Sequence, residues 1–244
     1  MPRLARVAVG GQIYHVLNRA AGRRKLFSSS ADYAAFQRCL ADAATSVPGC
    51  RVLGYAIMPD HFHLILWPKK TGELSAFMRK TSLPHAVRWN SSHKTIGQGP
   101  IYQGRFKSFI VAESHLPKLL HYVLRNPVRS KLAKTPGAWP WTSATTAPAK
   151  GAHPVTLAKP PSPLPATFKK TLDSAESPED LTAIRKSVVR GSPFGTDEFV
   201  KKTAGKLGLQ STLRARGRPR IHPLPPPTKP EPKSEAKAKA KKKK

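Results

Sequence analysis

The sequence predicts an α+β domain built on an antiparallel sheet of the ferredoxin-like, split βαβ type. Segments with strand and helix patterns follow one another in the order strand, helix, strand, strand, helix, strand, helix, which is the order of that fold with one appended helix. A tight turn at Pro59-Asp60 joins two adjacent strand patterns and indicates a hairpin. The composition changes after Trp141, where a proline-rich stretch begins. We therefore expect one sheet domain, backed by helices on one face, followed by a different kind of chain.

The first half of this domain should contain a strand, a helix and a hairpin. A strand pattern covers residues 12–17 and leads into a basic loop. A helix should start at Ser30 or Asp32, either of which can cap it, and apolar residues then recur at helical spacing as far as Pro48. The hairpin is expected at 51–67.

The second half should contain two further helices around one strand. A helix at 74–90 is expected to be kinked or interrupted at Pro84. A strand follows at 106–111, and Ser114 is expected to cap the last helix, which must stop near Asn126-Pro127 because proline disfavours a helical residue before it. The residues expected on the inner side of the 74–90 helix are Leu74, Phe77, Met78, Thr81 and Val87.

Composition divides the chain into four parts. Residues 1–146 are expected to form the sheet domain, and 147–176 a proline-rich linker. Residues 177–213 should form a small helical extension. The stretch 214–244 has proline, lysine and alanine but almost nothing apolar to bury, so we expect a disordered basic tail.

Charge is the strongest global signal. The chain has 43 Lys and Arg against 13 Asp and Glu, a formal net charge of +30, which favours nucleic acid as partner. An anionic membrane is the alternative, but no apolar span, lipidation signal or basic amphipathic helix accompanies the charge. No signal peptide is recognised, and Cys39 and Cys50 have no zinc or disulfide spacing, so we expect a cytoplasmic, nucleoid-associated protein.

Two histidines stand at the start of the second hairpin strand. His61 and His63 are separated by one residue, so in a strand they project from the same face while Phe62 packs into the core on the other. Two imidazoles at this spacing can bind a divalent metal ion and leave positions for another ligand and a substrate oxygen. The alternative is that both histidines are satisfied by backbone carbonyls or lie exposed at a sheet edge.

Tyr122 and Asn126 are candidates to complete that site. On a helix they are i and i+4, so the phenol and the carboxamide lie on one face. A phenolic oxygen can attack phosphorus if its proton is removed, and an asparagine oxygen can complete a metal shell. The alternative is an aromatic residue at the core edge and a helix stop before proline.

Five motifs in their family order give the chain a specific resemblance between about Gln12 and Ser143. The motifs are Tyr14-His-Val-Leu-Asn-Arg19, Met58-Pro-Asp-His-Phe-His-Leu64, Tyr102-Gln-Gly-Arg-Phe-Lys-Ser108, Tyr122-Val-Leu-Arg-Asn-Pro-Val-Arg129 and Trp139-Pro-Trp-Thr-Ser143. With them the chain resembles the single-tyrosine HUH transposases, and most closely their REP-associated branch.

The resemblance implies a function and a role for each residue. His61 and His63 would bind Mg²⁺ or Mn²⁺, with Asn126 in the place of the third ligand, and Tyr122 would attach to a DNA 5′ phosphate. The substrate would be single-stranded DNA with hairpin repeats, cleaved and rejoined by a monomer or homodimer. Asp60 stands where family members often have asparagine.

The DNA contacts are expected from basic residues near the strands and in the tail. The Arg216-Gly-Arg-Pro219 run also has the core pattern of a minor-groove hook, and the C-terminal extension resembles that of many members of the branch. The alternative is a solvated basic face for the cations near the strands and a basic linker for the Arg216–Pro219 run. The candidates are Arg19, Arg23, Arg24, Lys25, Arg105, Lys107, Arg216 and Arg218.

The sequence thus favours a metal-dependent DNA transposase that acts through a 5′-phosphotyrosine. A non-catalytic DNA- or RNA-binding protein on the same fold is the alternative, because a basic antiparallel face with aromatic residues also binds RNA.

Overall fold

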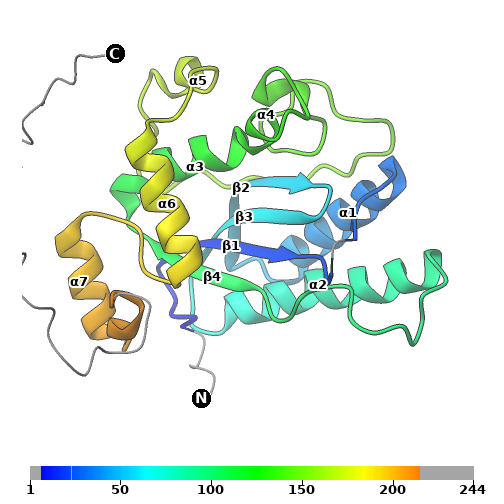
Figure 1. The fold of residues 1–244 in the computed structure, drawn as a ribbon, viewed down its shortest axis with the longest axis horizontal. Coiled ribbons are helices and arrows are strands. Elements are labelled where there is room, and N and C mark those ends of the chain that lie inside the picture. The colour runs from blue at the N-terminus through cyan, green and yellow to red at the C-terminus, as the bar shows by residue number, and fades with distance from the viewer. Residues whose placement is uncertain (1–6, 23, 215–244) are drawn as a thin grey trace, which may run out of the picture. The chain divides into compact units, whose positions relative to one another are not determined.

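The chain forms a four-stranded antiparallel sheet in the order β2-β3-β1-β4 (Figure 1). The structure is a computed structural model that describes residues 7–22 and 24–214, and the chain up to Leu213 forms one compact unit. This strand order confirms the predicted ferredoxin-like fold. The strands are β1 (Ile13–Arg19), β2 (Cys50–Met58), β3 (His61–Pro68) and β4 (Lys107–Val111).

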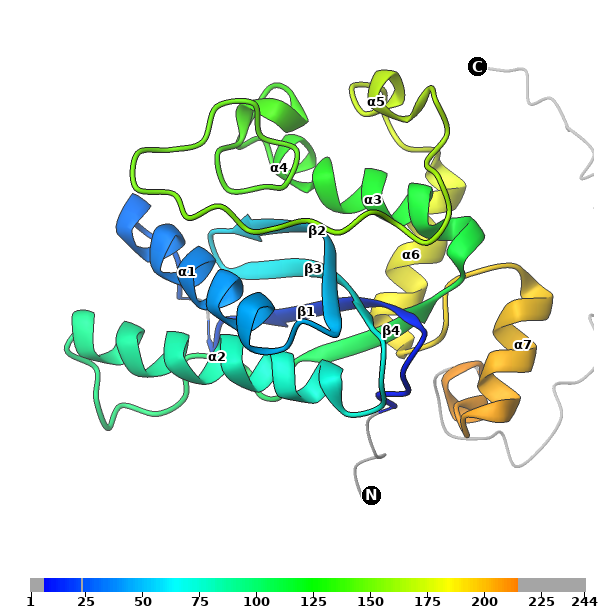
Figure 2. The same ribbon diagram turned by 180° about the vertical axis from the view of Figure 1, so that it is seen from behind.

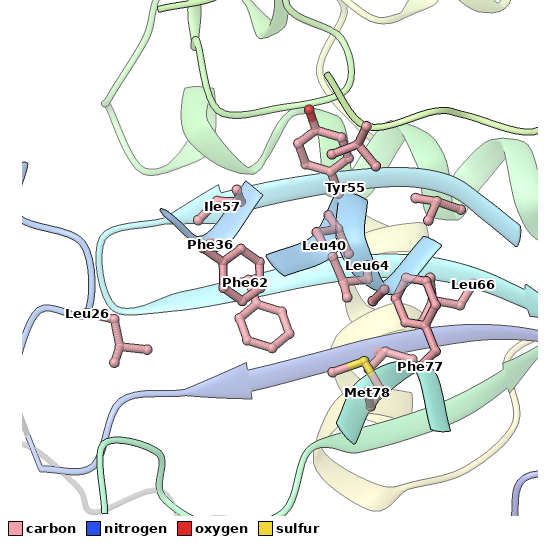
Figure 3. Packing of buried hydrophobic residues seen from close by; sticks show 14 of the residues in the cluster. Leu26, Phe36, Leu40, Tyr55, Ile57, Phe62, Leu64, Leu66, Phe77 and Met78 are labelled. Carbon is pink, nitrogen blue, oxygen red and sulfur yellow. The ribbon is translucent and has the colours of Figure 1, made fainter. Parts of the chain in front are cut away.

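Helices α1 (Ser30–Ser46) and α2 (Glu73–Ser92) cover one face of the sheet (Figure 2). The cap of α1 is Ser29, one residue before the predicted start, and Asp32 completes a capping box with it. The side chains between these helices and the sheet are fully buried and predominantly aromatic and aliphatic (Figure 3). Among them are Phe36, Leu40, Phe62, Leu64, Leu66, Phe77 and Met78.

Helix α2 runs without interruption through Pro84, contrary to the expectation of a break. Contacts after the proline hold the helix in place. The His85 Nδ1 lies 2.7 Å from the Tyr102 hydroxyl, and the Trp89 Nε1 donates to the Leu26 carbonyl at 2.7 Å. Tertiary packing therefore outweighs the cost of proline in a helix. Val87, predicted to face inward, is 61% exposed.

The other face of the sheet is covered as well, which corrects the expectation of helices on one face only. A short 3₁₀ turn, η1 (Glu113–His115), precedes α3 (Leu116–Leu124), so Ser114 is not the cap of this helix. Helix α4 (Asn126–Arg129) follows α3, and α6 (Pro178–Arg190) packs beside α3 (Figure 1). The second core joins Leu119, Leu120 and Val123 of α3 to Ile13, Ile65 and Val111 of the sheet and to Ile184 of α6.

The chain after residue 146 packs along the sheet domain. Residues 147–176 contain one short helix, α5 (Phe168–Thr171). In the same stretch Val155 is buried in the first core, the one between the sheet and helices α1 and α2. The Ala158 N–H donates to the Val52 carbonyl at 2.8 Å. Helix α7 (Asp197–Lys206) follows α6, and short 3₁₀ turns lie at Pro136–Ala138 and Gln210–Thr212. Of the expected tail at 214–244, only Arg214 is among the described residues.

Both outer strands of the sheet are paired along part of their edge. Beside β2, the Ile57 N–H donates to the Trp141 carbonyl at 2.9 Å, and the Ser143 N–H donates to the Tyr55 carbonyl at 3.0 Å. Beside β4, Phe194 exchanges backbone hydrogen bonds with Ile110 and Ala112, each 2.8 Å long. Segments late in the sequence thus complete the sheet. Within the described chain, no helix has the length and apolar character needed to cross a membrane.

Candidate active site

The paired histidines lie on β3 and face the helix α3, as their spacing predicted. The alternation of the strand places Phe62 and Leu64 in the first core, so that His61 and His63 project to the opposite face. Their ring centroids are 5.0 Å apart and their planes are nearly perpendicular. His63 is 5% exposed, and the His61 side chain is 22% exposed. The pair therefore lies at the boundary between the core and solvent.

Each histidine is held through its Nδ1 atom by a different partner. The His61 Nδ1 lies 2.6 Å from an Asp60 carboxylate oxygen, and the His63 Nδ1 lies 2.9 Å from the Nε2 of His15. When one ring nitrogen is held in this way, the other is oriented for a ligand. Both Nε2 atoms are therefore left available for a metal ion.

The pKa values of His63 and of its partner His15 agree with neutral rings. Burial, followed by the charges of His15, His61 and Arg129, holds the pKa of His63 well below its usual range. Burial also lowers the pKa of His15 to about 3. Both rings are therefore neutral near pH 7, and the neutral form is the one that binds metal. The hydrogen bond with His61, reinforced by Arg19, outweighs partial burial and holds the pKa of Asp60 well below its usual range.

Sequence reasoning did not identify His15 as part of the site. It lies on β1 diagonally across from His63, because the register pairs His15 with Ile65 and Leu17 with His63. The position of His15 on β1 predicts its contact with His63 only when the β1–β3 register is known. Asp60 stands where family members often have asparagine, and its contact with His61 gives it a structural role.

Helix α3 brings Tyr122 to the histidines. The apolar residues of α3 pack against the sheet, and the helix ends at Leu124, close to Pro127 as expected. The Tyr122 ring centroid is 6.1 Å from that of His63 and 6.3 Å from that of His15, and Tyr122 is 9% exposed. Asn126 follows on the separate helix α4 and is 8% exposed. The structure thus joins Tyr122 to the histidine pair.

The histidine pair has the chemistry to supply two ligands to a divalent metal ion. Within residues 7–22 and 24–214, no group of three or more His, Cys, Asp and Glu side chains could hold a metal. A metal at the histidine pair would therefore need a ligand of another kind, and an amide oxygen such as that of Asn126, which follows Tyr122 and begins α4, has the right chemistry for Mg²⁺ or Mn²⁺. The Nε2 atoms of His61 and His63, whose rings are held through Nδ1, would supply the other two positions.

Several of the predicted DNA-binding residues border a groove of about 760 Å³ beside β1 and β4. Arg19, Arg105 and Lys107 line it from the sheet side, and Arg190 of α6 lines it from the extension. Arg105 and Lys107 are exposed. Arg19 also bonds Asp60, at 2.6 Å. Arg190 was not among the predicted residues, because its approach to β4 depends on how the extension packs.

Among the described residues, Arg24 and Lys25 do not line this groove. Arg24 lies beside Trp89 on the α2 side, with its guanidinium carbon 5.9 Å from the ring centroid. Lys25 is exposed. Arg23, Arg216 and Arg218 lie outside the described residues.

Residues 8–126 match the family model described as "Transposase IS200 like". This part of the chain belongs to the IS200-like transposase family. The match confirms the expected transposase family, and it contains the histidine pair, Tyr122 and Asn126. No curated protein matches the chain.

Two solved structures that match the chain are described as transposases. One is a REP-associated tyrosine transposase bound to a REP hairpin, which is 18% identical with a TM-score of 0.50 and covers 68% of this chain and 96% of its own. Another is a putative transposase from Deinococcus radiodurans R1, which is 20% identical with a TM-score of 0.36 and covers 50% of this chain and 95% of its own. The first supports the assigned fold.

Proposed function

We propose that this IS200-like transposase cleaves and rejoins single-stranded DNA next to hairpin repeats, with Tyr122 as the nucleophile. The observation that carries the proposal is the position of the Tyr122 ring, whose centroid lies 6.1 Å from that of His63, one of two neighbouring histidines whose Nε2 atoms are available. A tyrosine hydroxyl near a metal-binding pair suits attack on a phosphodiester.

In the proposed reaction, the Tyr122 oxygen forms a bond to phosphorus while the bond from phosphorus to the 3′ oxygen breaks. The phenolic proton is lost to water, and the departing 3′ oxygen takes up a proton. His61, His63 and Asn126 would hold Mg²⁺ or Mn²⁺, which polarises the phosphate when bound. The 5′-phosphotyrosine keeps the energy of the broken bond, so rejoining to another 3′ hydroxyl needs no nucleotide cofactor.

The groove beside β4 is the proposed path of the DNA strand. Arg105, Lys107 and Arg190 offer separate cations along it, and such contacts position a strand by its phosphates without reading its sequence. The hairpin bound to the structurally similar REP-associated transposase motivates a hairpin substrate for this chain and its placement in the same branch. We expect a monomer or homodimer that acts in the cytoplasm, on the nucleoid.

The test is the capture of a covalent adduct. Labelled DNA carrying repeat hairpins from the region around its own gene is incubated with the protein and Mg²⁺ or Mn²⁺ and analysed by denaturing electrophoresis. Wild-type protein should give an adduct, and Tyr122→Phe should give none while binding the hairpin equally well, because only the oxygen is removed. Tyr33→Phe is the matched control, since Tyr33 is a buried tyrosine of the first core.

Two outcomes would contradict the proposal. An adduct that persists in Tyr122→Phe would move the nucleophile to another residue. Hairpin binding that is unchanged by a metal chelator, with no adduct from the wild-type protein, would instead favour the non-catalytic nucleic-acid-binding protein.

A further inference from the structure

A buried cluster of charges lies behind Tyr122. Glu176, from the segment before α6, accepts hydrogen bonds from both Arg125 and Arg129. The Glu176 side chain is 5% exposed, that of Arg125 10% and that of Arg129 17%. A carboxylate this deeply buried needs such partners, because removing one charge from a buried pair is strongly destabilising. The fold therefore depends on Arg125 and Arg129 to keep Glu176 paired.

Arg129 contacts the tyrosine in two ways. Its guanidinium carbon lies 4.1 Å from the centroid of the Tyr122 ring. Its Nη2 donates a 2.8 Å hydrogen bond to the Tyr122 carbonyl. That carbonyl belongs to the last turn of α3, where carbonyl groups need partners outside the helix. One side chain thus fixes both the backbone and the ring plane of Tyr122.

Residues 172–176 are attached to α3 and Arg125 by further hydrogen bonds. Arg125 donates to the Leu172 carbonyl at 2.9 Å, and the His121 Nε2 lies 3.1 Å from the Ser174 carbonyl. Both Arg129 and Glu176 lie outside residues 8–126, the part of the chain that matches the family model. The Tyr122 contacts therefore depend on a segment that follows the matched domain.

We propose that Arg129, held by Glu176, is a positioning residue for Tyr122, and that residues 172–176 are thereby part of the catalytic machinery. This inference rests on the proposed function. Two guanidinium groups share one carboxylate, so the cluster keeps an excess of one positive charge beside the tyrosine ring. A fixed positive charge stabilises the negative charge that develops on the phenolic oxygen when it is the leaving group during rejoining.

Four variants test the inference: Arg129→Ala, Glu176→Gln, the double variant, and Asp180→Asn as the control. Asp180 forms a 2.8 Å ion pair with Lys118, so it also joins the extension to α3 but does not contact Arg129. The measurements are the single-turnover rate of adduct formation, the hairpin affinity and the thermal unfolding midpoint. The rate should fall roughly 10- to 100-fold in Glu176→Gln, as is typical when the partner of an active-site residue is removed.

Three further results should accompany that loss. Hairpin affinity should stay near the wild-type value, and Asp180→Asn should keep the wild-type rate. The double variant should be no slower than Arg129→Ala alone, because Glu176 acts through Arg129. Guanidinium ions added to Arg129→Ala should restore part of the rate, which a general loss of structure would not allow.

Specific results would overturn the inference. A Glu176→Gln variant as fast as wild type would remove Glu176 from the machinery. A double variant slowed by the product of the two single effects would show that the residues act independently. Absence of an adduct in the wild-type protein would refute the proposed function itself, and this role with it.

Discussion

Replacement of His15 by phenylalanine tests how the metal site is oriented. His15 is 2% exposed, and its Nε2 lies 2.9 Å from the Nδ1 of His63. Phenylalanine keeps a ring of similar size, so most packing is retained. In the tautomer that leaves the His63 Nε2 free for a metal, the buried Nδ1 proton of His63 loses its acceptor, which should lower the free energy of unfolding by about 1–3 kcal/mol. The His63 ring also becomes free to turn away from a metal.

The second effect is the more specific one. Loss of an outer partner of a metal-binding histidine typically lowers affinity by roughly 10- to 100-fold, or about 1.4–2.7 kcal/mol. Titration calorimetry with Mn²⁺ measures it directly, and urea unfolding without metal measures the stability change. His153→Phe is the control, because His153 bonds Arg38 and not the histidine pair. Equal manganese affinity in His15→Phe and wild type would refute the proposed orientation of His63.

Three further predictions concern the metal ligands, a buried histidine and the groove. His61→Ala and His63→Ala should each abolish adduct formation in Mg²⁺ while hairpin binding persists. His63→Ala should also lower the free energy of unfolding, because His63 is 5% exposed. Cleavage at the wild-type rate in either variant would exclude that residue as a ligand. Burial lowers the pKa of His85 to about 4, so the unfolded chain binds a proton first as the pH falls. The free energy of unfolding should therefore drop by about 3 kcal/mol between about pH 6.5 and pH 4 from this residue, and urea unfolding of His85→Gln should lack that part of the decrease; an identical pH dependence would contradict the assignment. Lys107→Gln should weaken hairpin binding and reduce the slope of log affinity against log salt by about one, whereas an unchanged slope would place the DNA elsewhere.

Local periodicity explains what the sequence predicted well. Strand alternation correctly placed Phe62 in one core and the histidine pair on the other face, because side-chain direction in a strand depends only on neighbouring residues. The end of α3 at Leu124 lies close to Pro127 as predicted, but the reason given for it fails, because Asn126 before the proline is helical and begins α4. Tyr122 was selected by its spacing from Asn126, and α3 does bring it to His63.

Contacts between distant segments were not predictable from local patterns. The bond between His15 and His63 requires the β1–β3 register, and the bonds of Glu176 to Arg125 and Arg129 require a fold of the proline-rich stretch that its composition does not indicate. The expectation that Pro84 interrupts α2 was wrong, because packing around the helix outweighs the cost of proline in it. The residues that support His63 and Tyr122 could therefore be identified only from the three-dimensional structure.

The pairing of Phe194 with β4 limits where this protein can be shortened. A fragment ending at residue 146 would match the composition boundary, yet it would leave the backbone groups of Ile110 and Ala112 without the partners they have here. It would also expose the apolar residues that Ile184 and Phe194 cover. Bare strand edges and uncovered apolar surface promote self-association. Expression of the catalytic unit should therefore extend through Leu213, and an insoluble short fragment would say nothing about its chemistry.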